Sequence, residues 1–264
     1  MYNISGLGYD YFEAQVGIQD QGSVNQVRFT VLVDGVEKVS YTATAQQGAQ
    51  RIQANIQGGS TLTLRVNSVL EAGNPYGVAH AYDASNWCNA VLFKDNGYAS
   101  NQLWSDETKT VGVWANRNLN LWNSVLTIGG ASYLNGIGTH ANSTIELDIR
   151  GKNYNSFTSI VGSADSPYSY TGGKIGFKVA VLDAGKAVLR ESDLITEQKI
   201  GGVPIQISLA GGSYVQLITL DGGDGIGGDG GAWCEAKLST GVMLIKVANL
   251  SAYSTTSTPD VTIS

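Results

Sequence analysis

The strongest constraint on the fold is an internal repeat: four short segments in the first part of the chain recur, in the same order, in the second part. The spacing between matching segments drifts only as loop insertions and deletions would make it drift. Such self-similarity predicts two copies of one structural unit. The matching pairs are residues 9–17 with 154–162, 27–31 with 175–179, 58–60 with 211–213, and 86–92 with 232–238.

Both copies are predicted to consist of strands. Short runs of Val, Ile, Leu, Tyr and Thr are broken by Gly, Asn, Asp and Ser, and sustained helical periodicity is nearly absent, which favours an all-β protein. The clearest strand is 144–149, where apolar side chains alternate with polar ones such as Glu146. The small residues of 136–143 predict a tight loop before it, which presents His140.

The two copies are unequal in length. The second has upstream material that has no counterpart before the first. We therefore expect an abbreviated unit at 1–95, a complete unit at 96–240 and a tail at 241–264. A sandwich without its opening strands exposes a sheet edge. A longer chain, a neighbouring subunit or the strand-like run at 242–247 are three ways to cover that edge, and we expect the tail to pair with the first unit or with another chain.

Charge and hydropathy argue against several classes of partner. The formal net charge of −6 disfavours nucleic acid and anionic membranes, because phosphate binding needs clustered Lys and Arg. No run approaches the roughly 18 apolar residues of a membrane helix, and Met1–Asn3 does not begin a secretory signal. Cys88 and Cys234 occupy matching positions in separate units, so we expect two buried free thiols, which favours assembly in a reducing compartment.

Three ordered motifs stand out in the second copy, at residues 126–143, 157–165 and 219–238. Residues 126–133 followed by 136–143 resemble the opening of the NPCBM family of carbohydrate-binding modules. Residues 157–165 resemble its Phe-x-x-x-Val-Gly-x-Asp strand and turn, with one extra residue before Asp165. Residues 219–238 resemble its closing Asp-x-Gly-Asp-Gly…Asp…Ala-Trp-x-x-Ala-x-Leu segment. The resemblance covers the second copy well and the first partially.

This resemblance implies two galactose-binding-like jelly-roll β-sandwiches in tandem, the first abbreviated. Members of the family are usually appended to secreted glycoside hydrolases or surface proteins, and they bind galactose-containing or related glycans. The first copy keeps Asp83 and Trp87 but lacks the His140 loop. We therefore expect a working glycan site in the second copy only.

The loop at 221–231 is rich in glycine and carries Asp221, Asp224 and Asp229. Three carboxylates in a flexible loop can converge on a hard cation, and calcium prefers such oxygen ligands. The alternative is a solvated acidic turn, or a sugar-contacting loop, whose glycines serve backbone geometry alone. The sequence leaves both interpretations open.

The candidate sugar-binding residues also have alternative roles. His140 and Asn142 offer hydrogen bonds to sugar hydroxyls, but a histidine can equally fix its own loop. Trp233 can stack on a sugar ring, although its counterpart in the first copy favours a core position. Tyr168 and Tyr170 form an aromatic pair in a polar insertion and could serve as a platform for a sugar ring. The alternative is that this loop packs on its own sandwich. The full candidate set is His140, Asn142, Asp165, Tyr168, Tyr170 and Trp233.

The function predicted from the sequence is non-catalytic glycan binding or attachment. No nucleophile elbow, P-loop, zinc pattern or Cys/His pattern is present, and the two units use up the chain. The alternative is a structural component of a larger assembly, such as a virion decoration, tail or fibre protein, or an extracellular filament subunit, that forms oligomers through its first unit and tail. Both hypotheses place the protein on a virion or at a cell surface.

Overall fold

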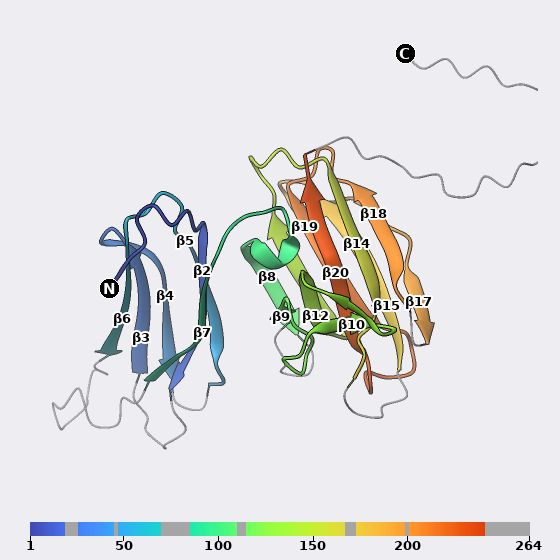
Figure 1. The fold of residues 1–264 in the computed structure, drawn as a ribbon, viewed down its shortest axis with the longest axis horizontal. Helices are drawn as coiled ribbons and strands as arrows, with labels where there is room; N and C mark the ends of the chain where they lie inside the picture. The colour runs from blue at the N-terminus through green and yellow to red at the C-terminus, as the bar shows by residue number, and fades with distance from the viewer. Residues whose placement is uncertain are drawn as a thin grey trace, which may run out of the picture.

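The structure is a computed structural model that describes residues 1–18, 26–44, 47–69, 85–109, 115–166, 173–198 and 201–240. Within these residues the chain forms strands and one short 3-10 helix, η1 (Ala99–Asn101). No helix in this part of the chain is long enough to span a bilayer. The strands group into two successive β-sandwiches (Figure 1). The predicted all-β tandem with an abbreviated first unit is therefore confirmed.

The first sandwich packs a sheet of order β1-β6-β3-β4 against one of order β5-β2-β7. Alternation along the strands turns Phe12, Ala14 and Val16 of one sheet toward Phe29 and Val31 of the other. The strands are β1 (Tyr2–Asn3), β2 (Tyr11–Ile18), β3 (Gln26–Val33), β4 (Val36–Thr44), β5 (Gln50–Asn55), β6 (Thr61–Val69) and β7 (Ser85–Phe93).

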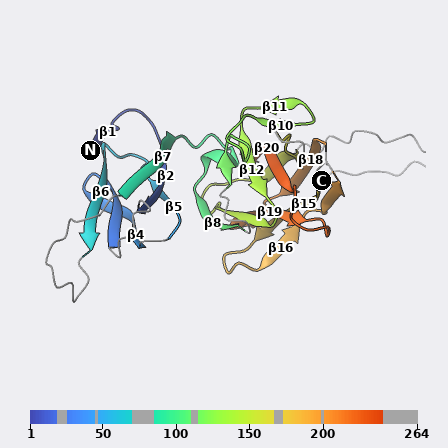
Figure 2. The ribbon, with the colours of Figure 1, turned by 90° about the horizontal axis from the view of Figure 1, so that it is seen from below.

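The second sandwich packs a sheet of order β18-β14-β20-β12-β9 against one of order β16-β15-β19-β13-β8, in which β17 also pairs with β15. A separate hairpin, β10–β11, packs on the outside of β20 (Figure 2). The strands are β8 (Trp104–Lys109), β9 (Asn116–Arg117), β10 (Leu126–Ile128), β11 (Ala131–Tyr133), β12 (Gly136–His140), β13 (Ser143–Asp148), β14 (Ser156–Ser163), β15 (Lys174–Leu182), β16 (Val188–Glu191), β17 (Ile195–Gln198), β18 (Val203–Ser208), β19 (Tyr214–Asp221) and β20 (Gly230–Ser239).

The repeat seen in the sequence is a repeat of packing. Trp87 meets Phe29 edge-on at 5.3 Å between ring centroids, and Trp233 meets Phe177 edge-on at the same 5.3 Å. Both last strands carry a bulge that contains one residue with a positive φ, Asn89 in β7 and Glu235 in β20. The same residue types thus make the same contacts in both units.

The sequence predicted a loop at 136–143, but most of this segment is a strand. Residues 136–140 form strand β12, and only Ala141 and Asn142 turn the chain into β13. The glycines are required by close packing: a Cβ on Gly138 would clash with the backbone of Leu119 and Asn120. Small residues that indicate a loop in the sequence thus belong to a crowded strand.

One expectation about burial was wrong, and one polar side chain is more buried than its face of the strand suggests. Glu146 lies on the polar face of β13 but is only 2% exposed, because Lys186, Gln216 and Ser105 surround its carboxylate with hydrogen bonds. Cys88 is exposed, whereas Cys234 is fully buried under the β10–β11 hairpin, and burial raises the pKa of its thiol to about 12. The first unit has no such hairpin in the described chain, so its matching thiol stays accessible.

Candidate functional site

The β12–β13 turn, the β19–β20 loop and the residues that follow β14 meet at one end of the second sandwich. The backbone N–H of Asp221 donates to the side-chain oxygen of Asn142 at 2.7 Å, which ties the β19–β20 loop to the β12–β13 turn. The N–H of Ala141 donates to the carbonyl of Asp229 at 3.2 Å, and Ala164, just after β14, donates to Gly230 at 2.9 Å. These bonds assemble residues from distant parts of the sequence into one site.

The β19–β20 loop folds around two of its own carboxylates. Oδ1 of Asp221 accepts hydrogen bonds from the N–H groups of Gly223, Asp224 and Gly225, at 2.7 to 3.2 Å. Both oxygens of Asp224 accept from the N–H of Lys174, at 3.0 and 3.1 Å. Gly223 and Gly225 have φ values of 100° and 92°, which only glycine adopts readily. The loop geometry therefore holds these two carboxylates in place.

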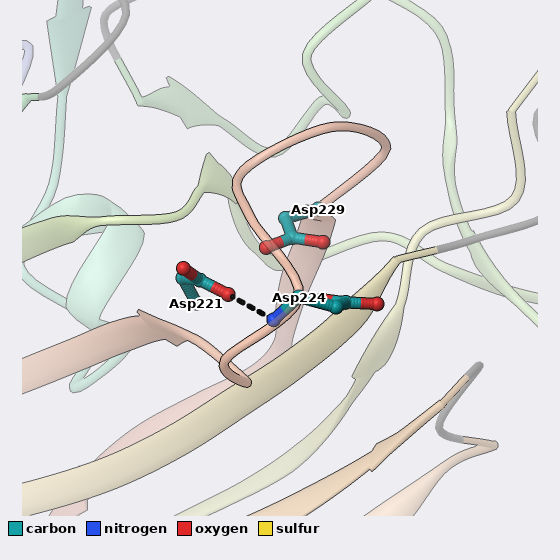
Figure 3. A group of neighbouring side chains, drawn as sticks. All are labelled: Asp221, Asp224 and Asp229. Atoms are coloured by element: carbon teal, nitrogen blue, oxygen red, sulfur yellow. Dashed lines mark hydrogen bonds between the residues drawn. The ribbon is translucent and has the colours of Figure 1, made fainter.

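The third carboxylate, Asp229, completes the group shown in Figure 3. One ligand oxygen from each of Asp221, Asp224 and Asp229 lies within 4.8 Å of the others. Asp229 is 0% exposed, and neither of its oxygens has a hydrogen-bond partner in the described structure. Gly173 lies so close that a side chain there would collide with Asp229 Oδ1. A buried carboxylate without partners is costly unless something neutralises it.

The electrostatics of this acidic group favour a cation. Burial, and then the charges of Asp224 and Asp221, raise the pKa of Asp229 to about 6. Three clustered carboxylates supply the hard oxygen ligands that Ca²⁺ takes. The residues present thus fit a calcium ion, which would satisfy the unpartnered oxygens and offset the repulsion among the three charges.

His140 lies beside this group at the end of β12. Its Nδ1 lies 2.7 Å from the carbonyl of Ala141, so in a neutral ring Nδ1 carries the proton and Nε2 is the acceptor. The contact fixes the ring against its own turn, as one of the two sequence interpretations expected. It also sets the orientation in which Nε2 would meet a ligand hydroxyl.

The other candidates occupy different positions. Asp165 accepts hydrogen bonds from the N–H groups of Gly129 and Gly130, at 3.0 and 2.8 Å, and so holds the β10–β11 turn. Trp233 is 0% exposed and donates from Nε1 to Thr219 at 3.1 Å, so it is a core residue without an accessible ring face. Tyr168 and Tyr170 lie outside the described residues.

The sequence interpretation missed one aromatic residue at this end, Trp122. His140 pairs with Gly230 across β12 and β20, and side chains of directly paired residues point to the same face. A Cβ on Gly230 would lie 3.1 Å from the Trp122 ring, so the half-buried indole fills the space next to His140. Asn120 holds this loop by accepting from the N–H groups of Trp122 and Ser124. No periodicity marks Trp122; only the pairing of β12 with β20 reveals its place.

Comparison with known proteins gives matches to solved structures, whereas curated protein sequences give no significant match. The M60 catalytic domain with CBM51-1 and CBM51-2 of Clostridium perfringens ZmpB is 17% identical, with TM-score 0.46, over 90% of this chain and 33% of that one. CBM51 of C. perfringens GH95, solved with methyl-galactose, is 29% identical, with TM-score 0.46, over 54% of this chain and 98% of that one. Tandem CBM51 modules of a Streptococcus pneumoniae family 98 glycoside hydrolase are 19% identical, with TM-score 0.45, over 91% of this chain and 80% of that one. The chain thus spans about a third of the first of these proteins.

The family comparison covers nearly all of both sandwiches. The profile of the NPCBM/NEW2 domain matches residues 1–93 and again residues 95–239. These two segments contain the two sets of sheets and the repeated aromatic cores described above. The chain therefore belongs to the NPCBM/NEW2 family of carbohydrate-binding domains, of which it carries two tandem copies.

Proposed function

We propose that the second unit binds galactose-like or other cell-surface glycans at the end that carries His140, Asn142 and Trp122, next to a calcium ion held by the three aspartates. The observation that carries this proposal is the fully buried Asp229 carboxylate, whose two oxygens face the acidic group without hydrogen-bond partners. A bound cation would fix the β19–β20 loop. Because that loop is bonded to Asn142 and Ala141, the cation would also fix the turn that bears His140.

The roles of the side chains follow from their chemistry. The indole of Trp122 supplies an apolar surface for a sugar ring, and Nε2 of His140 accepts from a hydroxyl group. From the sequence alone, Tyr168 and Tyr170 are further proposed sugar contacts, as aromatic residues of a polar insertion. Asp165 positions the β10–β11 turn without touching the sugar in this scheme.

We assign the site to the second copy alone and a non-catalytic role to the protein. In the first copy, Val66-Asn67-Ser68 stands where the second has Thr219-Leu220-Asp221, and no described strand corresponds to β12. Asp83 lies outside the described residues. A single sugar site suits an attachment module at an extracellular or virion surface better than an enzyme, which needs catalytic groups across a cleft.

The test is a glycan-array screen of the full chain, with Ca²⁺ and with a chelator, followed by calorimetry with the best ligand. We expect selective binding that Trp122→Ala and His140→Ala weaken at least tenfold. Arg28→Ala, on the exposed surface of the first unit, is the control and should leave affinity unchanged. Equal affinity in all variants would overturn the site, and absence of binding together with a defined oligomer would favour the structural alternative.

A further inference from the structure

The first unit corresponds to the second unit without its opening strands. Ile4 donates its N–H to Ser60 at 2.9 Å, as Ile149 donates to Ser213 at 3.0 Å. Both isoleucines also approach the glycine that precedes that serine in the same way: a Cβ added to that glycine would lie 3.5 Å from Ile4 and 3.6 Å from Ile149. Ile4 therefore occupies the position of Ile149, and strand β1 corresponds only to the end of β13.

This correspondence leaves two sheet edges of the first unit open. In the second unit β20 lies between β14 and β12, whereas β7 pairs with β2 alone among the described strands. Strand β13 pairs with β19 from Tyr214 to Thr219, whereas β1 pairs with only Leu62 and Thr61 of β6. Both open edges border the same side of the first sandwich (Figure 2).

The core of the first unit is less covered along this side. Trp233, Leu217, Thr219 and Ala236 are all at most 1% exposed in the second unit. Their first-unit counterparts, in the same order Trp87, Leu64, Val66 and Ala90, are more exposed. Trp87 and Leu64 are half-buried, Val66 is 40% exposed and Ala90 is exposed. An open edge beside an apolar core is a site for strand addition.

We infer that the C-terminal run Val242–Val247 of the same chain adds to the open edge of β7 as an antiparallel strand. Its composition suits that position, because four consecutive apolar residues precede Lys246 and would meet the open core on one face and exposed Val91 on the other. The run follows the last strand of the second unit, which ends at Ser239.

The start of the tail lies near the end of β7, which makes the same chain the donor. The N–H of Leu238 donates to the carbonyl of Gly97 at 2.7 Å, and Tyr98 pairs with Lys237. Gly97 follows Phe93, the last residue of β7, by only a short stretch that spans about 14 Å when extended. The residues after Leu238 can cross that distance before the apolar run ends, so a second copy is not required.

The exposed thiol of Cys88 on β7 provides the test, since Cys234 is buried and unreactive. Single cysteines are placed at each position from 242 to 247, with Ser257→Cys as a control beyond the run, and mild oxidation is followed by mass spectrometry. We expect an intramolecular disulfide at alternate positions only, because the side chains of an added strand alternate between faces. Ser257→Cys should remain largely unlinked.

Hydrogen exchange on the full chain and on a chain lacking residues 241–264 provides the second measurement. We expect β7 amides to exchange at least tenfold faster after the deletion, while β20 amides are unchanged. Linked dimers would assign the edge to a second copy and overturn the intramolecular pairing. Equal linking at every position, or no linking with unchanged exchange, would overturn strand addition itself.

Discussion

Arg117 of the second unit and Glu13 of the first form a buried ion pair across the junction of the two sandwiches. The guanidinium Nε lies 2.7 Å from Oε2, and the two side chains are 8% and 10% exposed. In a second pair the arginine belongs to the first unit and the glutamate to the second: Nη1 of Arg51 lies 2.5 Å from Oε2 of Glu107. Both guanidinium groups lie against Trp104, at 3.9 and 4.6 Å from its ring centroid. These matched charges fix how the two copies sit on each other.

Arg117→Met should lower the free energy of unfolding by about 3–5 kcal/mol, because it leaves Glu13 buried with one cationic partner fewer. Urea unfolding of the full chain measures this. Arg28→Met removes the partner of Glu37 at a site where both side chains are about half exposed, and it should change stability little. Equal losses in the two variants would contradict the importance of the junction.

Acid should weaken the junction through Asp95, which pairs with Lys152 at 2.8 Å. Burial alone would raise the pKa of Asp95, but hydrogen bonds from Lys152, Gly97 and Gln102 outweigh it and hold the pKa below 3.8. Because the folded pKa is depressed, this stabilisation is present above pH 3.8 and is lost as the pH falls through the folded value. The difference in unfolding free energy between wild type and Asp95→Asn should therefore shrink below that pH. A difference that stays constant down to pH 2 would show that the charge contributes nothing.

Calcium should raise the melting temperature of the wild type and have no such effect on Asp229→Asn. Without metal, the variant should be the more stable form at pH 7, because the pKa of Asp229 is raised from 3.8 to about 6. The cost of its buried charge grows as the pH rises from 3.8 to about 6 and is present in full above that. This advantage should vanish near pH 4, where Asp229 is protonated in the fold. Calorimetry at both pH values measures it, with Asp193→Asn as an exposed control. A calcium response retained in Asp229→Asn would contradict the proposed ligand set.

The two matching tryptophans should differ in their effect on stability. Trp233→Ala should cost about 3–5 kcal/mol, because the side chain is fully buried and its Nε1 bonds to Thr219. Trp87→Ala should cost less, because Trp87 is only half-buried. Trp233→Phe, which keeps the core filled, should bind glycan as the wild type does, and calorimetric titration checks this. A selective loss of affinity in Trp233→Phe would restore Trp233 as a sugar contact.

Much of the fold could be predicted from the sequence because its signals are local. Alternation identified strands such as 144–149, and the repeat identified two units, since each copy repeats the same apolar faces. The expected loop at 136–143 was wrong because glycine there serves close packing rather than turning, and only neighbouring segments reveal that. The expectation that Cys88 is buried was wrong for a similar reason, since the hairpin that covers Cys234 has no described counterpart in the first unit.

The sequence by itself determined the tandem β architecture, the family and the grouping of three aspartates within one loop, because each depends on residues close together in the chain. The tertiary structure alone decided that both Asp229 oxygens are buried without partners and that Trp122 lies beside His140. It also decided that Arg117 meets Glu13, 104 residues away. Local patterns specify which face of a strand is apolar, whereas the packing of the whole chain determines which strands and side chains become neighbours.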